Sequence, residues 1–290
     1  MGEIFGVINI HKEKGCTSHD VVAAIRKKFG VKKAGHAGTL DPQATGVLPV
    51  CLGAAVKIAD YISASGKRYR GQLILGVTTD TQDHTGRVLE TRPVAWDMDA
   101  IKDAVVSFTG DILQKPPMYS AVKVGGKKLY EWAREGITIE RADRPVRINK
   151  IDVISVNSDA RTLVLDVDCE KGVYIRALCA DIGEKLGCGG CMGDLVRTRC
   201  GFFDVANSVY ISDASERDIW RVEDALGFPS IEVKPGGEGL MRNGNPIPVG
   251  LCECAGLAEG TIERVWKQPV PVAAYPVQDV PVLCGQRDHA

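Results

Sequence analysis

The pattern of apolar and polar residues predicts a chain in which strands and helices are mixed. Apolar and polar residues alternate in four segments, which predicts strands at 3–10, 67–77, 146–156 and 162–168. Five other segments are predicted as helices, at 18–29, 56–62, 98–108, 127–135 and 175–186. Because two strands follow one another directly near the middle of the chain, we expect an α+β fold. Its central sheet should be mixed and mostly antiparallel, with flanking helices.

The first predicted helix carries signals at both ends. Ser18 stands at its start, where a hydroxyl can accept hydrogen bonds from the free amides of the first turn. Gly30 stands just beyond its end, where a left-handed backbone is common. We therefore expect Ser18 to cap the helix and Gly30 to terminate it.

The composition changes after about residue 227. The tail is rich in Gly, Pro and Val and contains short strand-like pieces at 231–233, 247–249 and 261–265. We therefore expect a main domain at 1–226 and a small β-rich C-terminal appendage at 227–290. The chain has neither the G-x-G-x-x-G nor the G-x-x-x-x-G-K-[ST] pattern, so nothing in it points to a dinucleotide or ATP.

Composition places the chain among ordinary globular proteins, with 44% hydrophobic and 25% charged residues. No apolar run is long enough to cross a bilayer, and the first residues lack the order of a signal peptide. We expect a cytoplasmic protein without a membrane partner. Its ten cysteines are then expected to be reduced thiols. The single pair Cys188–Cys191 is too little for a zinc site, so no metal is expected.

Charge is distributed unevenly, although the net charge is only −1. Residues 1–70 hold eleven lysines and arginines against five acidic residues, and 141–150 form a second basic cluster. A basic face on a nearly neutral protein indicates a surface that binds phosphates. The alternative for each cluster is an ordinary solvated face.

The segment 35–48, GHAGTLDPQATGVL, places one carboxylate, Asp41, among glycines, small residues and a proline. Glycine allows backbone angles and close approaches that other residues do not, and proline stiffens the next turn. Such a loop is suited to holding one acid against a ligand. An aspartate before a proline is also a common turn former, so the loop alone leaves both interpretations open.

Seven segments together resemble the TruB-type pseudouridine synthase family. They follow the family's order and lie at 35–48, 67–70, 79–83, 117–123, 126–130, 172–176 and 195–201. The resemblance implies the pseudouridine synthase fold and an isomerase that converts a uridine in the T loop of tRNA without a cofactor. It also implies an RNA-binding thumb at about 119–147 and an RNA-binding, PUA-like appendage. The expected partner is the T-stem loop of tRNA, bound by a monomer that needs no protein partner.

The same resemblance assigns catalytic roles to Asp41, Tyr69 and Arg176. Asp41 matches the essential aspartate, which could attack C1′ of the sugar, attack C6 of the base, or stabilise charge. Tyr69 matches a tyrosine that stacks on the base and could accept the C5 proton. Arg176 matches the arginine that pairs with the aspartate.

Six further residues are expected to contact the substrate: Lys12, His36, Tyr174, Leu195, Arg141 and Arg144. In the family, the histidine enters the space that the flipped base leaves, and the leucine closes the pocket under the base. Lys12 is the family's basic residue near the site. Because Glu13 replaces the family's proline here, Lys14 is an alternative to Lys12. Arg141 and Arg144 belong to the thumb, where they would bind phosphates.

Three other functions fit parts of the pattern. A guide-dependent synthase acting on ribosomal RNA would share the fold, but the thumb and the short tail favour an enzyme that works alone. A tRNA-folding chaperone would need the RNA surface but not the three catalytic candidates. A redox or zinc protein using Cys188 and Cys191 would carry metal or a reactive thiol pair.

Overall fold

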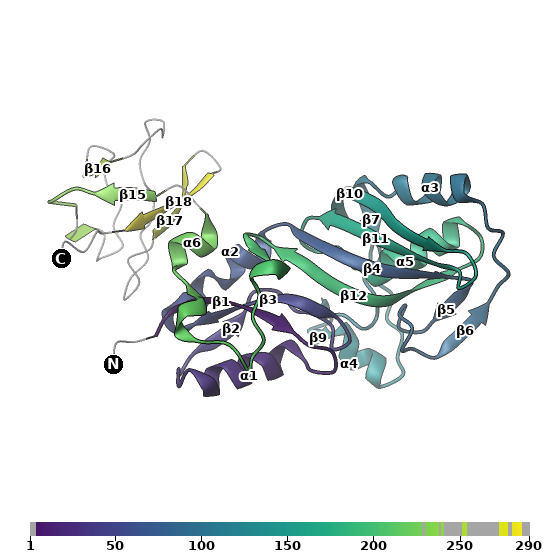
Figure 1. Cartoon of the computed structure of the whole chain (residues 1–290), viewed down its shortest axis with the longest axis horizontal. Coiled ribbons are helices and arrows are strands. Elements are labelled where there is room, and N and C mark those ends of the chain that lie inside the picture. The colour runs from purple at the N-terminus through teal and green to yellow at the C-terminus, as the bar shows by residue number, and fades with distance from the viewer. Residues whose placement is uncertain are drawn as a thin grey trace.

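The computed structural model describes residues 4–227, 230–237, 239–240, 251–253, 273–277 and 280–285 (Figure 1). Its main feature is a ten-stranded sheet in the order β14-β1-β3-β12-β4-β11-β10-β7, with β2 beside β3 and β13 beside β12. The strands are β1 (Gly6–Lys12), β2 (Ala34–His36), β3 (Thr45–Leu52), β4 (Lys67–Leu75), β7 (Gly110–Gln114), β10 (Arg144–Asn157), β11 (Thr162–Cys169), β12 (Gly190–Cys200), β13 (Phe203–Asp204) and β14 (Ile219–Trp220). The expected α+β fold with a mostly antiparallel sheet is confirmed.

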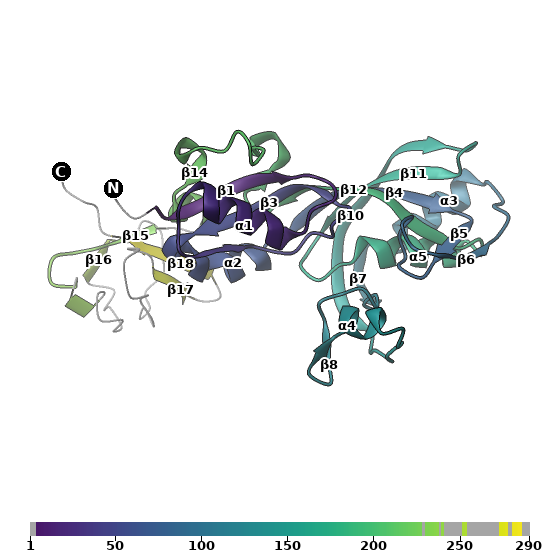
Figure 2. The ribbon, with the colours of Figure 1, turned by 90° about the horizontal axis from the view of Figure 1, so that it is seen from below.

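Helices and two hairpins complete the main domain. The helices are α1 (Ser18–Lys28), η1 (Gly53–Ile58), α2 (Ala59–Ala64), α3 (Met98–Val106), α4 (Leu129–Arg134), α5 (Ile175–Lys185), η2 (Val205–Asn207), η3 (Glu216–Asp218) and α6 (Val222–Leu226). The hairpins are formed by β5 (Val77–Thr79) with β6 (Val88–Thr91) and by β8 (Lys123–Val124) with β9 (Lys127–Lys128). Figure 2 shows α4 and β8 projecting from the sheet near β7. No helix among the described residues is long and apolar enough to cross a membrane.

The sheet joins two parts of the chain through the parallel pairing of β3 with β12. Gly46 lies opposite Arg197 there, with a left-handed φ of +98°. A Cβ atom at Gly46 would lie 2.3 Å from the carbonyl oxygen of Arg197, so only glycine fits this contact. This junction lies directly after the Asp41 loop and therefore fixes where the loop returns to the sheet.

The sheet is buried on both faces near β1. Ile8 and Ile10 point into the larger apolar cluster, and Val7 points into a smaller one. The larger cluster also holds Ile25 of α1 and Leu178 of α5. Helices α1 and α5 therefore cover one face of the sheet, and η1, α2 and α6 contribute to the cluster on the other face. The start of α5 lies beside the Asp41 loop, because Ile175 and Leu40 belong to the same cluster.

The start of α1 corrects one expectation. Thr17, not Ser18, is the N-cap: its hydroxyl accepts from the Asp20 amide (3.1 Å), and the Asp20 carboxylate accepts from the Thr17 amide (2.8 Å). The hydroxyl of Ser18 points instead to Leu40. At the other end, Gly30 is left-handed (φ +64°), as expected.

The C-terminal part contains a second sheet of four strands in the order β16-β15-β18-β17. These strands are β15 (Ser230–Val233), β16 (Cys252–Glu253), β17 (Ala273–Val277) and β18 (Val280–Gly285). The tail is therefore β-rich where it is described. The strand-like pieces expected at 247–249 and 261–265 lie outside the described residues.

Candidate active site

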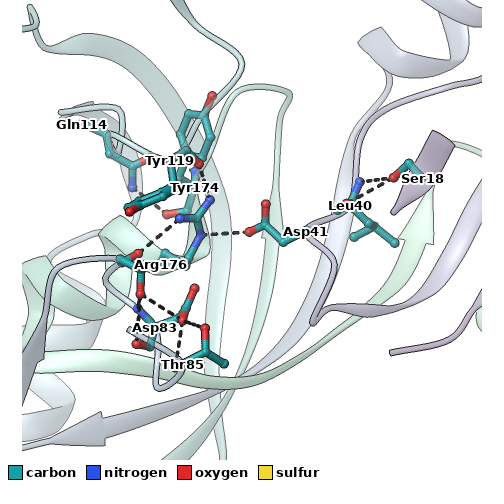
Figure 3. Close-up of polar contacts among 10 residues, drawn as sticks. Ser18, Leu40, Asp41, Asp83, Thr85, Gln114, Tyr119, Tyr174 and Arg176 are labelled. Atoms are coloured by element: carbon teal, nitrogen blue, oxygen red, sulfur yellow. Dashed lines mark hydrogen bonds and ion pairs between the residues drawn. The ribbon is translucent and has the colours of Figure 1, made fainter. Parts of the chain in front are cut away.

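The site is built around one ion pair between distant parts of the chain. Asp41 lies on the loop between β2 and β3, and Arg176 lies in the first turn of α5; their Oδ2 and Nε atoms are 2.8 Å apart (Figure 3). The side chain of Arg176 is 5% exposed and that of Asp41 is 40% exposed. The other guanidinium nitrogens donate to the carbonyls of Thr81 (3.2 Å) and Tyr119 (2.8 Å). A fixed arginine thus holds a carboxylate that a ligand can still reach.

Lys12 holds the Asp41 loop through hydrogen bonds to its backbone. Its side chain is fully buried, and Nζ donates to the carbonyls of Pro42 (3.0 Å) and Ala44 (2.7 Å). Burial lowers the pKa of Lys12. The structure therefore places Lys12 under the loop rather than on the surface. Lys14, the alternative, lies at the surface, where its ammonium pairs with a carboxylate.

Arg197 holds the other side of this loop. It is fully buried on β12, and its nitrogens donate to the carbonyls of Val47 (2.8 Å), Gly38 (3.0 Å) and Thr39 (3.3 Å). The pattern of apolar residues does not predict a functional role for Arg197, although this residue lies in segment 195–201, one of those that carry the family resemblance. A permanent charge among apolar strand positions is the one signal that could have found it.

Tyr69 lies on β4 and is buried among apolar residues of the larger cluster. Burial raises the pKa of Tyr69 to about 12, while a hydrogen bond from Arg197 and the charge of that arginine act in the opposite direction. The phenol is therefore protonated at neutral pH. Arg197 thus contacts both Tyr69 and the segment that leads to Asp41.

Ser18 fixes the backbone directly before Asp41. Its hydroxyl donates to the carbonyl of Leu40 (3.1 Å) and accepts from the amide of Leu40 (2.9 Å) (Figure 3). Both residues are buried. The loop is therefore held at the residue before Asp41 by a side chain of α1.

Tyr174 stands two residues before Arg176, at the N-cap position of α5. Its backbone amide and carbonyl are both hydrogen-bonded to the side chain of Gln114. Figure 3 shows Tyr174, Tyr119 and Gln114 gathered around Arg176 on the side away from the Asp41 loop. The backbone of Tyr174 is thus fixed by Gln114 next to Arg176.

The turn between β5 and β6 supplies the Thr81 carbonyl. The Oδ1 atom of Asp83 accepts from the hydroxyl of Thr81 (3.0 Å) and from the amide and hydroxyl of Thr85 (2.9 and 2.6 Å). One carboxylate therefore organises this turn, which faces Arg176 (Figure 3).

Leu195 is buried on β12 opposite Gly71 of β4. A Cβ atom at Gly71 would lie 3.2 Å from side-chain atoms of both Leu195 and Ile175. Glycine therefore lets Leu195 approach the start of α5, close to Arg176.

His36 ends β2, five residues before Asp41. Its ring stands edge-on to that of His19, with centroids 5.3 Å apart, and its Nδ1 is buried without a partner. Burial lowers the pKa of His36, and the nearby His19 and Arg197 lower it further. The imidazole is therefore neutral at physiological pH.

Arg141 and Arg144, the two arginines expected to bind phosphates, have different surroundings. Arg141 donates to the carbonyls of Pro116 (2.7 Å) and Ile139 (3.1 Å), and burial lowers the pKa of Arg141. Arg144 is exposed on β10, in register with Gln114. The structure does not place either arginine in contact with Asp41. Arg141 therefore links the backbone at Pro116 and Ile139, and Arg144 faces solvent.

Cys188 and Cys191 are buried free thiols. In the part of the chain that the structure describes, no three His, Cys, Asp or Glu side chains gather as a metal site. Nothing observed at these cysteines points to a ligand.

Two protein-family models match this chain. Residues 26–175 match the model of the TruB family pseudouridylate synthase N-terminal domain. Residues 176–225 match that of the tRNA pseudouridylate synthase B C-terminal domain. Asp41 thus lies in the first matched range, and Arg176 is the first residue of the second.

Among curated relatives, the chain is 49% identical to the tRNA pseudouridine synthase B of Alkaliphilus oremlandii, over 76% of this chain and 73% of that one. It is 44% identical to that of Clostridium tetani, over 82% and 84%. Among solved structures, it resembles a chain of a Cbf5-Nop10-Gar1 complex with a TM-score of 0.70 and 28% identity, over 93% of this chain and 78% of that chain.

Proposed function

The chain belongs to the TruB family of pseudouridylate synthases, and we propose that it converts a uridine in the T loop of tRNA to pseudouridine. As a pseudouridine synthase it is an isomerase. The observation that carries the proposal is the partly exposed Asp41 carboxylate held by the buried Arg176. The reaction breaks a C–N glycosidic bond and forms a C–C bond on the same nucleotide, so it needs no cofactor.

Asp41 supplies the reacting carboxylate. It attacks C1′ of the sugar or C6 of the base, or it stabilises charge while the base is detached. Arg176 keeps the carboxylate in one place, because its three contacts leave the guanidinium little freedom.

Three residues receive the target nucleotide. A uridine within a folded loop must leave its stack, which costs a few kcal/mol. Tyr69 stacks on the extruded base, and Leu195 closes the pocket below it. His36, neutral and with an unpartnered nitrogen, enters the space that the base leaves. Lys12, with its ammonium turned to backbone carbonyls, acts through the Asp41 loop.

The remaining surface binds RNA outside the reacting nucleotide. Residues 1–226 form the catalytic domain, and 119–147 form a thumb on which Arg144 binds phosphate. Residues 227–290 form a PUA-like RNA-binding unit; the four-stranded sheet in the tail supports this assignment. The protein works as a monomer in the cytoplasm, without an obligatory protein partner.

Two other functions are less well supported. A guide-dependent synthase of ribosomal RNA would fit the fold, since the similar solved structure is a Cbf5-Nop10-Gar1 complex. The identity of 28% to that structure is, however, well below the 49% to a tRNA pseudouridine synthase B. A chaperone would not require a carboxylate held by a buried arginine, although one protein could perform both activities.

The direct test incubates the purified chain with an unmodified tRNA transcript and maps pseudouridine by sequencing. We expect pseudouridine at one position in the T loop, although no guide RNA, partner protein or cofactor is added. A matched transcript with cytidine at that position should remain unmodified. A chain that refolds tRNA but forms no pseudouridine would refute the proposal in favour of a chaperone.

A further inference from the structure

Gln114 is buried at the end of β7, and neither the sequence pattern nor the family comparison assigns it a role. It is 2% exposed. Its Oε1 accepts from the backbone amide of Tyr174 (2.8 Å), and its Nε2 donates to the carbonyl of Tyr174 (3.1 Å). The carboxamide therefore pairs with one residue's backbone as a neighbouring strand would.

The residue that Gln114 holds is the one that starts α5. The Tyr174 carbonyl also accepts the first helical hydrogen bond, from the amide of Leu178 (3.0 Å). Arg176 follows two residues later, so the position of its backbone depends on where the helix begins. Gln114 thus sets the origin of the helix that carries the arginine.

The chain after Gln114 contacts Arg176 directly. Residues 114–119, here called the strap, contain Pro116 and Pro117 and end at Tyr119. The Tyr119 carbonyl accepts from Nη2 of Arg176 (2.8 Å). Two prolines stiffen the backbone between these attachments. The strap therefore holds the start of α5 at one end and the guanidinium at the other (Figure 3).

We propose that Gln114 is a positioning residue for the Asp41–Arg176 ion pair. The inference rests on the proposed function, because it concerns the carboxylate that performs that reaction. Without the carboxamide, the amide of Tyr174 would lose its partner and the carbonyl would keep only the Leu178 amide, at a part-buried place, so the start of α5 would shift to satisfy the amide. A displacement of about 1 Å at a reacting group can cost a hundredfold in rate.

The test replaces Gln114 with methionine, which has similar length and volume but cannot form these hydrogen bonds. In steady-state assays on a T-loop transcript, we expect kcat to fall about 10- to 100-fold. KM and the Kd for tRNA should stay within about twofold, because the RNA surface is unchanged. The matched control is Leu113→Ala, next to Gln114 on β7 but 69% exposed, which should keep wild-type kcat.

A double mutant separates positioning from general loosening of the fold. If Gln114 acts through Arg176, then Gln114→Met should cost little further activity in an Arg176→Lys background. Additive losses would overturn the inference, as would a variant that loses tRNA binding while kcat is unchanged. If the methionine variant does not fold, Gln114→Glu is measured in the same way, since it keeps an acceptor for the Tyr174 amide. Its kcat should also fall while KM and the Kd for tRNA stay nearly unchanged.

The wild type distinguishes the two proposals. A wild-type chain that forms no pseudouridine overturns the proposed function. An active wild type whose Gln114→Met variant has unchanged kcat overturns the positioning role alone.

Discussion

Two adjacent hydroxyls at the start of α1 offer a sharp test of how the Asp41 loop is held. Thr17 caps the helix, whereas Ser18 pairs with both backbone groups of Leu40, the residue before Asp41. Replacing each by alanine removes one hydroxyl from almost the same place. Only Ser18→Ala, however, frees the loop that carries the reacting carboxylate.

The hydrogen bonds that each variant removes determine the expected loss of unfolding free energy. Thr17→Ala removes a helix cap, which costs about 1 kcal/mol of unfolding free energy. Ser18→Ala leaves the amide and the carbonyl of Leu40 buried without that partner, and each such group costs about 1–3 kcal/mol. We therefore expect Ser18→Ala to cost about 2–6 kcal/mol of unfolding free energy. It should also lower kcat about tenfold or more, because Asp41 is no longer held in register with Arg176.

Urea unfolding gives the two stability losses, and pseudouridine formation on a T-loop transcript gives the two rates. The account predicts that Thr17→Ala keeps its kcat while Ser18→Ala does not, under conditions where both are folded. Equal kcat values for the two variants and the wild type would refute the idea that Ser18 positions the loop.

Three further outcomes are expected. Tyr69→Phe should keep most activity and Tyr69→Leu should lose about 5- to 150-fold, since stacking contributes about 1–3 kcal/mol; a phenylalanine variant as inactive as the leucine variant would make the phenol a required base. The lowered pKa of His36 means that the unfolded chain binds its proton more readily, so the free energy of unfolding falls as pH drops below 6.5. Between pH 7.5 and pH 5, the free energy of unfolding should fall less for His36→Asn than for the wild type. An equal fall in both proteins would contradict the effect of burial on His36. Arg144→Gln should weaken tRNA binding and reduce the slope of log K against log salt by about 1, whereas an unchanged slope would exclude a phosphate contact.

The sequence pattern predicted β1, β4, β10 and β11 but not β3 or β12. β3 is buried on both faces, so its apolar residues do not alternate, and it contains Gly46 and Pro49. In β12, two irregularities in the pairing with β4 break the period of two. By contrast, β4 also lies at the centre of the sheet, but its residues alternate between buried and more exposed positions, so the period of two finds it.

The site shows a similar limit. Asp41 and Arg176 were found through motif resemblance, and the structure brings them together. Ser18, Gln114 and Arg197 act on backbone atoms that lie 22, 60 and about 150 residues away in the sequence. Because every residue has the same backbone groups, no side-chain pattern reveals which carbonyl a buried side chain will meet.

Whether Asp41 is the reacting carboxylate is tested by comparing wild type with Asp41→Asn on one tRNA transcript, with pseudouridine formation and RNA affinity measured together. Asparagine keeps the shape of the side chain and removes its charge. The account predicts a loss of turnover of about 10³-fold or more, with a Kd for tRNA within about threefold of wild type. Pseudouridine formation at the wild-type rate by Asp41→Asn would contradict it.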